Sequence, residues 1–185
     1  MKRFSLSQLT IAATCASLLA STAYAQVNGS GMSDSTLFDT VINIPTAPNI
    51  GNSQSVGGVA GQTTQLNLFD GGSIGGGFDV NSGAELNIFG GSTGFGLDVF
   101  ANAEANIFGG EDIQSLNALP GSQLNISGGT FSGNSFTATE AEVNVTGGNI
   151  EQFSFGSGTT ANISGGRFDF LTAVSYTHLT LPTKA

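Results

Sequence analysis

The stretch Leu86-Asn87-Ile88-Phe89-Gly90-Gly91 decides the fold, because it recurs in degenerate form along most of the chain. Each copy contains an apolar residue, an asparagine, a second apolar residue and then a glycine-containing turn. The asparagines of successive copies are 20, 19, 19, 19 and 18 residues apart; they are Asn67, Asn87, Asn106, Asn125, Asn144 and Asn162. A fixed period of about 19 residues indicates a solenoid built from stacked repeats.

The alternation within each copy predicts a short strand, with the two aliphatic side chains on one face and the asparagine on the other. The Gly-Gly pair ends that strand, since glycine adopts backbone angles closed to other residues. A second alternation follows in each repeat: Phe78-Asp79-Val80, Leu97-Asp98-Val99, Leu116-Asn117-Ala118, Phe136-Thr137-Ala138, Phe153-Ser154-Phe155 and Phe168-Asp169-Phe170. Stacked coils can bury these apolar residues against those of the next coil. The prediction is an all-β fold, a parallel β-helix or β-solenoid with five full coils and a truncated sixth.

The repeated asparagine requires an explanation, because asparagine is disfavoured in strands. Amide side chains that stack from coil to coil can hydrogen-bond to one another along the solenoid axis. We therefore interpret the six asparagines as a structural ladder, and a row of ligand-binding amides is the alternative.

The segments outside the repeats are identified by their amino-acid composition. Residues 1–25 are typical of a secretory signal peptide, with Lys2 and Arg3 before an apolar run and a small-x-small cleavage site at residues 23–25. Residues 26–62 are expected to be flexible, apart from Val41-Ile42-Asn43-Ile44, which is either a degenerate first coil or part of a cap. The solenoid repeats are expected over residues 63–173.

The end of the chain, residues 174–185, is expected not to continue the repeat. Residues 174–183 closely resemble the translation of a sequencing adapter, which implies a non-native tail after a repeat array cut at about Ala173. A sixth coil cut in this way would leave an unpaired strand edge, so self-association is expected.

The formal net charge of −9 argues against nucleic acids and anionic membranes as partners. Cys15 is the single cysteine and lies in the signal segment, so no disulfide or thiol chemistry is expected in the mature chain. The apolar run of the signal is too short to remain in a bilayer, so no membrane insertion is expected. These features predict an exported protein, extracellular, at the cell surface or periplasmic, without a cofactor.

The Asn-Ile-Phe-Gly-Gly and Asn-Ile-Ser-Gly-Gly coils over residues 41–173 resemble those of secreted bacterial repeat proteins with parallel β-helix architecture. That resemblance implies a non-catalytic structural or adhesive protein of the cell surface, with polysaccharide or other surface proteins as partners. The alternatives are a carbohydrate-binding β-helix module and a fragment of a larger polysaccharide-active β-helix enzyme.

Three phenylalanines form the candidate ligand surface. Phe69, Phe89 and Phe108 each follow an inward aliphatic residue, so alternation predicts that they point outward and stack. An exposed row of aromatic side chains can mark a binding surface. The alternative is that a cap or a neighbouring loop covers them.

Asp79 and Asp98 occupy equivalent positions in adjacent coils and are the weak metal candidates. Like charges that face each other on paired strands are destabilising. Solvent exposure, a raised pKa of one acid or a bound cation would relieve the repulsion. Two carboxylates are few for Ca²⁺, which takes six to eight oxygen ligands, so we expect solvent exposure and no dedicated metal site.

Overall fold

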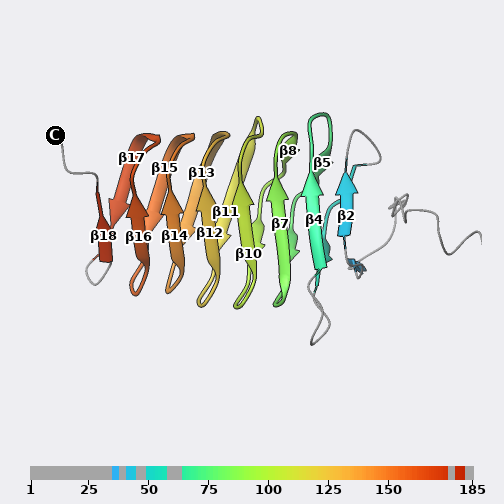
Figure 1. The fold of residues 1–185 in the computed structure, drawn as a ribbon, viewed down its shortest axis with the longest axis horizontal. Coiled ribbons are helices and arrows are strands. Elements are labelled where there is room, and N and C mark those ends of the chain that lie inside the picture. The colour runs from blue at the N-terminus through green and yellow to red at the C-terminus, as the bar shows by residue number, and fades with distance from the viewer. Residues whose placement is uncertain (1–34, 38–40, 45–48, 58–63, 175–177, 182–185) are drawn as a thin grey trace, which may run out of the picture.

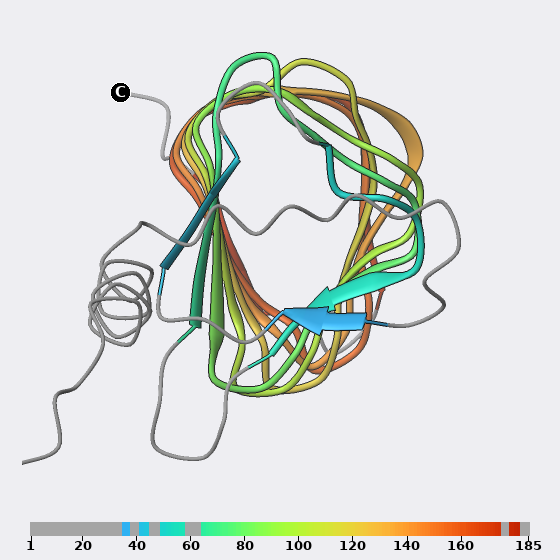
Figure 2. The ribbon, with the colours of Figure 1, turned by 90° about the vertical axis from the view of Figure 1, so that its right-hand side faces the viewer.

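The computed structural model describes residues 35–37, 41–44, 49–57, 64–174 and 178–181. Every regular element of these residues is a β-strand, and all strand pairs are parallel. The strands stack along one axis as successive coils (Figure 1). Viewed along that axis, the coils superimpose on one rounded outline (Figure 2). The predicted β-solenoid is confirmed.

One side of the solenoid is an eight-stranded sheet in which each coil contributes one strand. Its strands are β2 (Val41–Ile44), β4 (Thr64–Leu68), β7 (Ala84–Ile88), β10 (Glu104–Ile107), β12 (Gln123–Ile126), β14 (Glu142–Val145), β16 (Thr160–Ile163) and β18 (His178–Thr180). They contain the apolar-Asn-apolar copies, and the asparagines pair in register from Asn43 to Asn162.

The other side is a ten-stranded sheet. Its main path is β1 (Ser35–Leu37), β3 (Gln54–Val56), β6 (Phe78–Val80), β9 (Leu97–Val99), β11 (Ile113–Ala118), β13 (Thr130–Ala138), β15 (Asn149–Phe155) and β17 (Arg167–Ala173). The short strands β5 (Ser73–Ile74) and β8 (Ser92–Thr93) pair with each other beside this path, and β8 also pairs with β11.

The core lies between the two sheets and consists of aligned rows of aliphatic and aromatic side chains. Two of its rows come from the residues that flank each asparagine, and all of them are buried: Leu66, Leu86, Ala105, Leu124, Val143 and Ala161, then Leu68, Ile88, Ile107, Ile126, Val145 and Ile163. Full burial of one large aliphatic side chain contributes roughly 1.5–3 kcal/mol relative to exposure. Strand period and coil period together therefore produce one continuous core.

Val41–Ile44 is a coil of the stack. Strand β2 pairs with β4 in the register of the repeat, with Asn43 opposite Asn67. Of the two alternatives for this segment, the structure shows the degenerate coil. The predicted signal peptide, residues 1–25, lies outside the described residues, as does most of the N-terminal segment 26–62.

The predicted second strand of the last coil is wrong by three residues. Leu171, Thr172 and Ala173 pair with Phe153, Ser154 and Phe155, and the expected Phe170 lies opposite Gln152. Phe170 is accordingly 67% exposed. The error arose because Phe168-Asp169-Phe170 has the right alternation, whereas the position along the coil is set by pairing with β15.

The expectation that residues after Ala173 do not continue the repeat is also wrong. His178–Thr180 forms β18, and Thr160, Ala161 and Asn162 of β16 pair with it in parallel. Leu179 is partly buried against the core. A polar-apolar-polar triplet is enough to occupy this edge, so the pairing is independent of whether the tail is native, which stays a prediction.

In the described part of the chain, no helix is long and apolar enough to cross a membrane.

Candidate functional site

The outer face of the eight-stranded sheet carries three parallel rows of side chains, because alternate residues of each strand point outward. The outer polar row consists of Gln65, Glu85, Glu104, Gln123, Glu142 and Thr160. The Asn ladder consists of Asn67, Asn87, Asn106, Asn125, Asn144 and Asn162. The third row begins with the Phe row, Phe69, Phe89 and Phe108, and continues as the hydroxyl row, Ser127, Thr146 and Ser164.

The Asn ladder is continuous over six coils. In each step, the Nδ2 of one asparagine donates to the Oδ1 of the asparagine in the preceding coil. The five distances, from Asn87–Asn67 to Asn162–Asn144, are 3.0, 3.1, 2.8, 3.0 and 3.0 Å. Each of these hydrogen bonds joins two coils, so the amides form the row that the sequence predicts as structural.

Carboxylates of the outer polar row use further amide hydrogens of the ladder. The Glu85 Oε1 accepts from Asn87 Nδ2 at 3.0 Å and from Asn106 Nδ2 at 3.3 Å. The Glu104 Oε1 accepts from Asn125 Nδ2 at 2.9 Å. These charged acceptors strengthen the ladder, since hydrogen bonds to ionised groups are stronger than neutral ones. The ladder amides are thus engaged with one another and with glutamates.

The Phe row is exposed and stacked. Phe69, Phe89 and Phe108 are 37%, 46% and 50% exposed. Ring centroids are 5.2 Å apart between the first two and 4.9 Å between the last two, and the rings are within 11° of parallel. Among the described residues, no cap or loop covers the rings, so they form an aromatic strip along the axis.

Two glycines in each turn fix the spacing of this strip, for different reasons. A Cβ on Gly109 would lie 2.3 Å from the carbonyl oxygen of Phe89, and a Cβ on Gly128 would lie 2.2 Å from that of Phe108. A side chain at the first glycine of each pair would therefore clash with the backbone of the preceding coil, so glycine there allows adjacent coils to stack closely. The second has a positive φ, +106° at Gly110 and +89° at Gly129, which disfavours other residues. The chain turns directly behind each outward side chain of the strip.

Asp79 and Asp98 lie on the outer face of the ten-stranded sheet. They pair with each other across β6 and β9, and Asn117 of β11 continues the row. Both carboxylates are half-buried, which differs from the expected solvent exposure. Asn117 Nδ2 donates to Asp98 Oδ1 at 2.6 Å, and Thr137 Oγ1 donates to Asn117 Oδ1 at 2.8 Å. A hydrogen-bonded side chain of the next coil thus stabilises Asp98, an arrangement that none of the three sequence-based alternatives included.

The described residues contain no group of three or more His, Cys, Asp or Glu side chains that could hold a metal ion. The two acids at Asp79 and Asp98 are thus not joined by a third carboxylate or an imidazole.

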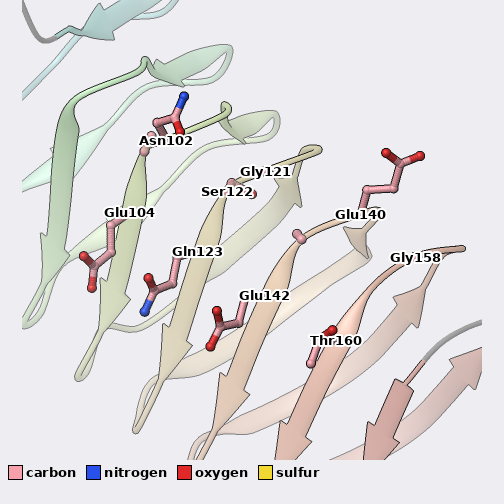
Figure 3. Close-up of a pocket in the computed structure, with 11 residues that line it drawn as sticks. Asn102, Glu104, Gly121, Ser122, Gln123, Glu140, Glu142, Gly158 and Thr160 are labelled. Atoms are coloured by element: carbon pink, nitrogen blue, oxygen red, sulfur yellow. The ribbon is translucent and has the colours of Figure 1, made fainter.

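A surface hollow of about 680 Å³ lies beside the outer polar row where the coils turn into β10, β12 and β14. Glu104, Gln123 and Glu142 point to the same side of it, whereas Glu140 points away from them (Figure 3). The lining is polar and acidic, without a basic side chain. Glu104 also accepts the amide hydrogen bond from Asn125, so this carboxylate belongs to the ladder.

A second hollow, of about 530 Å³, adjoins the turns after the Phe row and is lined by Asp70, Glu111 and Asp112 among others. Hydrogen bonds donated by Ser132 and then by Gln114 hold the pKa of the Asp112 carboxyl below its ordinary value. Sequence reasoning missed Asp112, because its partner Ser132 is 20 residues away, in the next coil. The sequence signal that could have revealed this pair is that Asp112 and Ser132 lie about one repeat period apart.

Protein-family models, curated proteins and solved structures were compared with this chain, and none of them matches it.

Proposed function

We propose that this chain is an exported, non-catalytic structural or adhesive repeat protein, in which the outer face of the eight-stranded sheet contacts a partner outside the cell. The observation that carries the proposal is the exposed Phe row beside the Asn ladder. An aromatic strip of this kind is costly to leave in water unless a partner covers it. The hydrogen bonds of the neighbouring ladder join the coils that carry these rings.

The arrangement of charges supports a contact role over catalysis. Glycoside hydrolysis needs two carboxyl groups on either side of the scissile bond. Here three acidic side chains serve the fold: Glu85 and Glu104 accept from the Asn ladder, and Asp98 accepts from Asn117. The basic side chains of the described residues are Arg167 and His178, and both are exposed at the last coils.

Carbohydrate binding is the second candidate function, and the exposure of the Phe rings favours it. The apolar C–H faces of sugars pack against aromatic rings, and amphipathic aromatic surfaces are common in contact sites. The excess of acidic over basic residues favours a neutral partner over an anionic one.

The test is adhesion of the purified full-length chain to intact bacterial cells and to insoluble polysaccharides. A Phe89→Asp variant places a charge in the middle of the Phe row and should abolish retention. Phe95, 66% exposed and outside the row, provides the matched control, and Phe95→Asp should leave retention unchanged. Equal loss in both variants, or no retention of the unmodified chain on any surface, would contradict the proposed contact face.

A further inference from the structure

The third row changes chemistry between two successive coils. Phe108 follows Ile107, and Ser127 follows Ile126, which pairs with Ile107. The backbone N–H groups of Phe108 and Ser127 both donate to the preceding coil at 2.8 Å, so the two residues occupy equivalent positions. Phe108 is 50% exposed and Ser127 is exposed as well. An aromatic ring and a hydroxyl therefore lie side by side on the surface.

The row of stacked rings ends at this boundary between Phe108 and Ser127. Phe89 has a parallel ring on each side, Phe69 and Phe108. Phe108 has a stacked ring on the Phe89 side only, among the described residues, and its other side is directed toward the coil of Ser127. The small serine does not replace the missing ring, so Phe108 can accept another flat group in the stack.

The polar groups at the boundary fit a neutral hydroxylated ligand. Ser127 Oγ and Thr146 Oγ1 each donate a long hydrogen bond of 3.4 Å to a backbone carbonyl. Their oxygens retain the capacity to accept hydrogen bonds. The outer polar row on the same face contains Glu104 and Glu142 and no basic residue, which disfavours anionic ligands.

We propose that the step from Phe108 to Ser127 is a glycan subsite that takes one pyranose ring of a neutral polysaccharide. The C–H face of the sugar packs on the ring of Phe108, and its hydroxyls bond to Ser127 and Thr146. This subsite rests on carbohydrate binding, the second candidate function above. It requires both an aromatic and a hydroxyl neighbour, which distinguishes it from binding along the whole Phe row.

Calorimetric titration of the full-length chain with a soluble β-1,4-linked glucose hexasaccharide tests the subsite. Ser127→Leu fills the space beside Phe108 with an aliphatic side chain and removes the hydroxyl, and Phe108→Ala removes the ring. Each should weaken binding by up to about tenfold, the effect of losing one aromatic contact. Phe69→Ala, at the other end of the row, should leave the affinity within about twofold of the unmodified chain. Ser127→Phe should retain binding, because it recreates the same aromatic–hydroxyl step one coil further, beside Thr146.

The outcomes separate the subsite from the broader proposal. Unchanged affinity in Ser127→Leu together with a loss in Phe69→Ala would overturn the subsite and leave glycan binding along the Phe row. Equal binding of polygalacturonate would overturn the neutral ligand class. No binding of the hexasaccharide by the unmodified chain would overturn the subsite, while adhesion of that chain to cells would still support the contact face. Thermal melts of each variant exclude unfolding as the cause of a loss.

Discussion

The first and second halves of the solenoid differ in where they place their aromatic residues. In the coils from β4 to β10, three phenylalanines lie outside as the Phe row. In the coils from β13 to β15, Phe131, Phe136, Phe153 and Phe155 are buried and pack against one another, with centroid distances of 4.5–6.4 Å. The exposed Phe row thus belongs to the first half and the cluster of contacting buried phenylalanines to the second, although Phe78 of the first half is buried as well.

The backbone of the ten-stranded sheet changes along with the core. In the first half, each coil divides this side into two short strands, β5 and β6 or β8 and β9, with a glycine-rich corner between them. Gly77 and Gly96 adopt positive φ there, +68° and +78°. In the second half, β13 and β15 run through the corner as single strands with register shifts between coils. The interrupted strands coincide with the positive-φ glycines Gly77 and Gly96, and the continuous strands coincide with the contacting buried phenylalanines.

The largest expected effect contrasts a buried phenylalanine with an exposed one. Phe153→Ala removes a fully buried ring between Phe136 and Phe155 and should lower the free energy of unfolding by about 3–5 kcal/mol. Phe89→Ala removes a half-exposed ring from the Phe row and should cost only about 0.5–1.5 kcal/mol. Urea denaturation followed by circular dichroism measures both. Similar losses would show that the two halves do not differ as described.

A substitution in the Asn ladder tests whether the rows of the outer face depend on one another. Asn106 donates to Asn87 and Glu85 and accepts from Asn125. Asn106→Ala leaves these partners unsatisfied and should cost about 1–3 kcal/mol. In the same denaturation experiment, Asn149→Ala, which removes an exposed amide of β15 outside the ladder, serves as the matched control with little effect. A neutral Asn106→Ala would exclude an energetic role of the ladder.

Among the described residues of the first half, one buried polar side chain lacks a hydrogen-bond partner. Thr93 pairs between Ile74 and Ile113, is 3% exposed, and its Oγ1 has no hydrogen-bond partner among the described residues. Thr93→Val should stabilise the fold by about 1 kcal/mol, since it removes a buried unsatisfied hydroxyl at nearly constant shape. Thermal denaturation measures the rise in Tm, and Thr93→Ser is the control that keeps the hydroxyl. A lower Tm in Thr93→Val would indicate that the hydroxyl has a partner.

The smallest effect is expected at the junction of the two halves. Hydrogen bonds from Ser132 and Gln114 lower the pKa of Asp112 in the folded state. A depressed pKa contributes stability above the unfolded-state pKa, and that contribution is lost as the pH falls through the folded value. Asp112→Asn should therefore reduce the loss of Tm between neutral pH and about pH 3, where carboxylates titrate. The exposed site makes the change small, and an identical pH profile in Asp112→Asn would argue against this linkage.

The period of the repeat made the architecture predictable, because alternation and coil length are both local properties of the sequence. It also predicted the positions of Asn67 to Asn162 and the outward direction of the Phe row. The last coil could not be placed in this way, since Phe168-Asp169-Phe170 alternates as well as Leu171-Thr172-Ala173 does. Pairing with β15 decided between them.

The sequence by itself determined a stack of parallel coils and the rows that each coil contributes. Only the tertiary structure decided what the side chains of neighbouring rows do to one another. Glu85 became an acceptor for the Asn ladder, Asp98 gained Asn117 as donor, and Asp112 gained Ser132. These contacts join residues from different coils or from different rows of one face. Their geometry depends on the turns that set the coils at one spacing, and a linear pattern of residue types does not contain it.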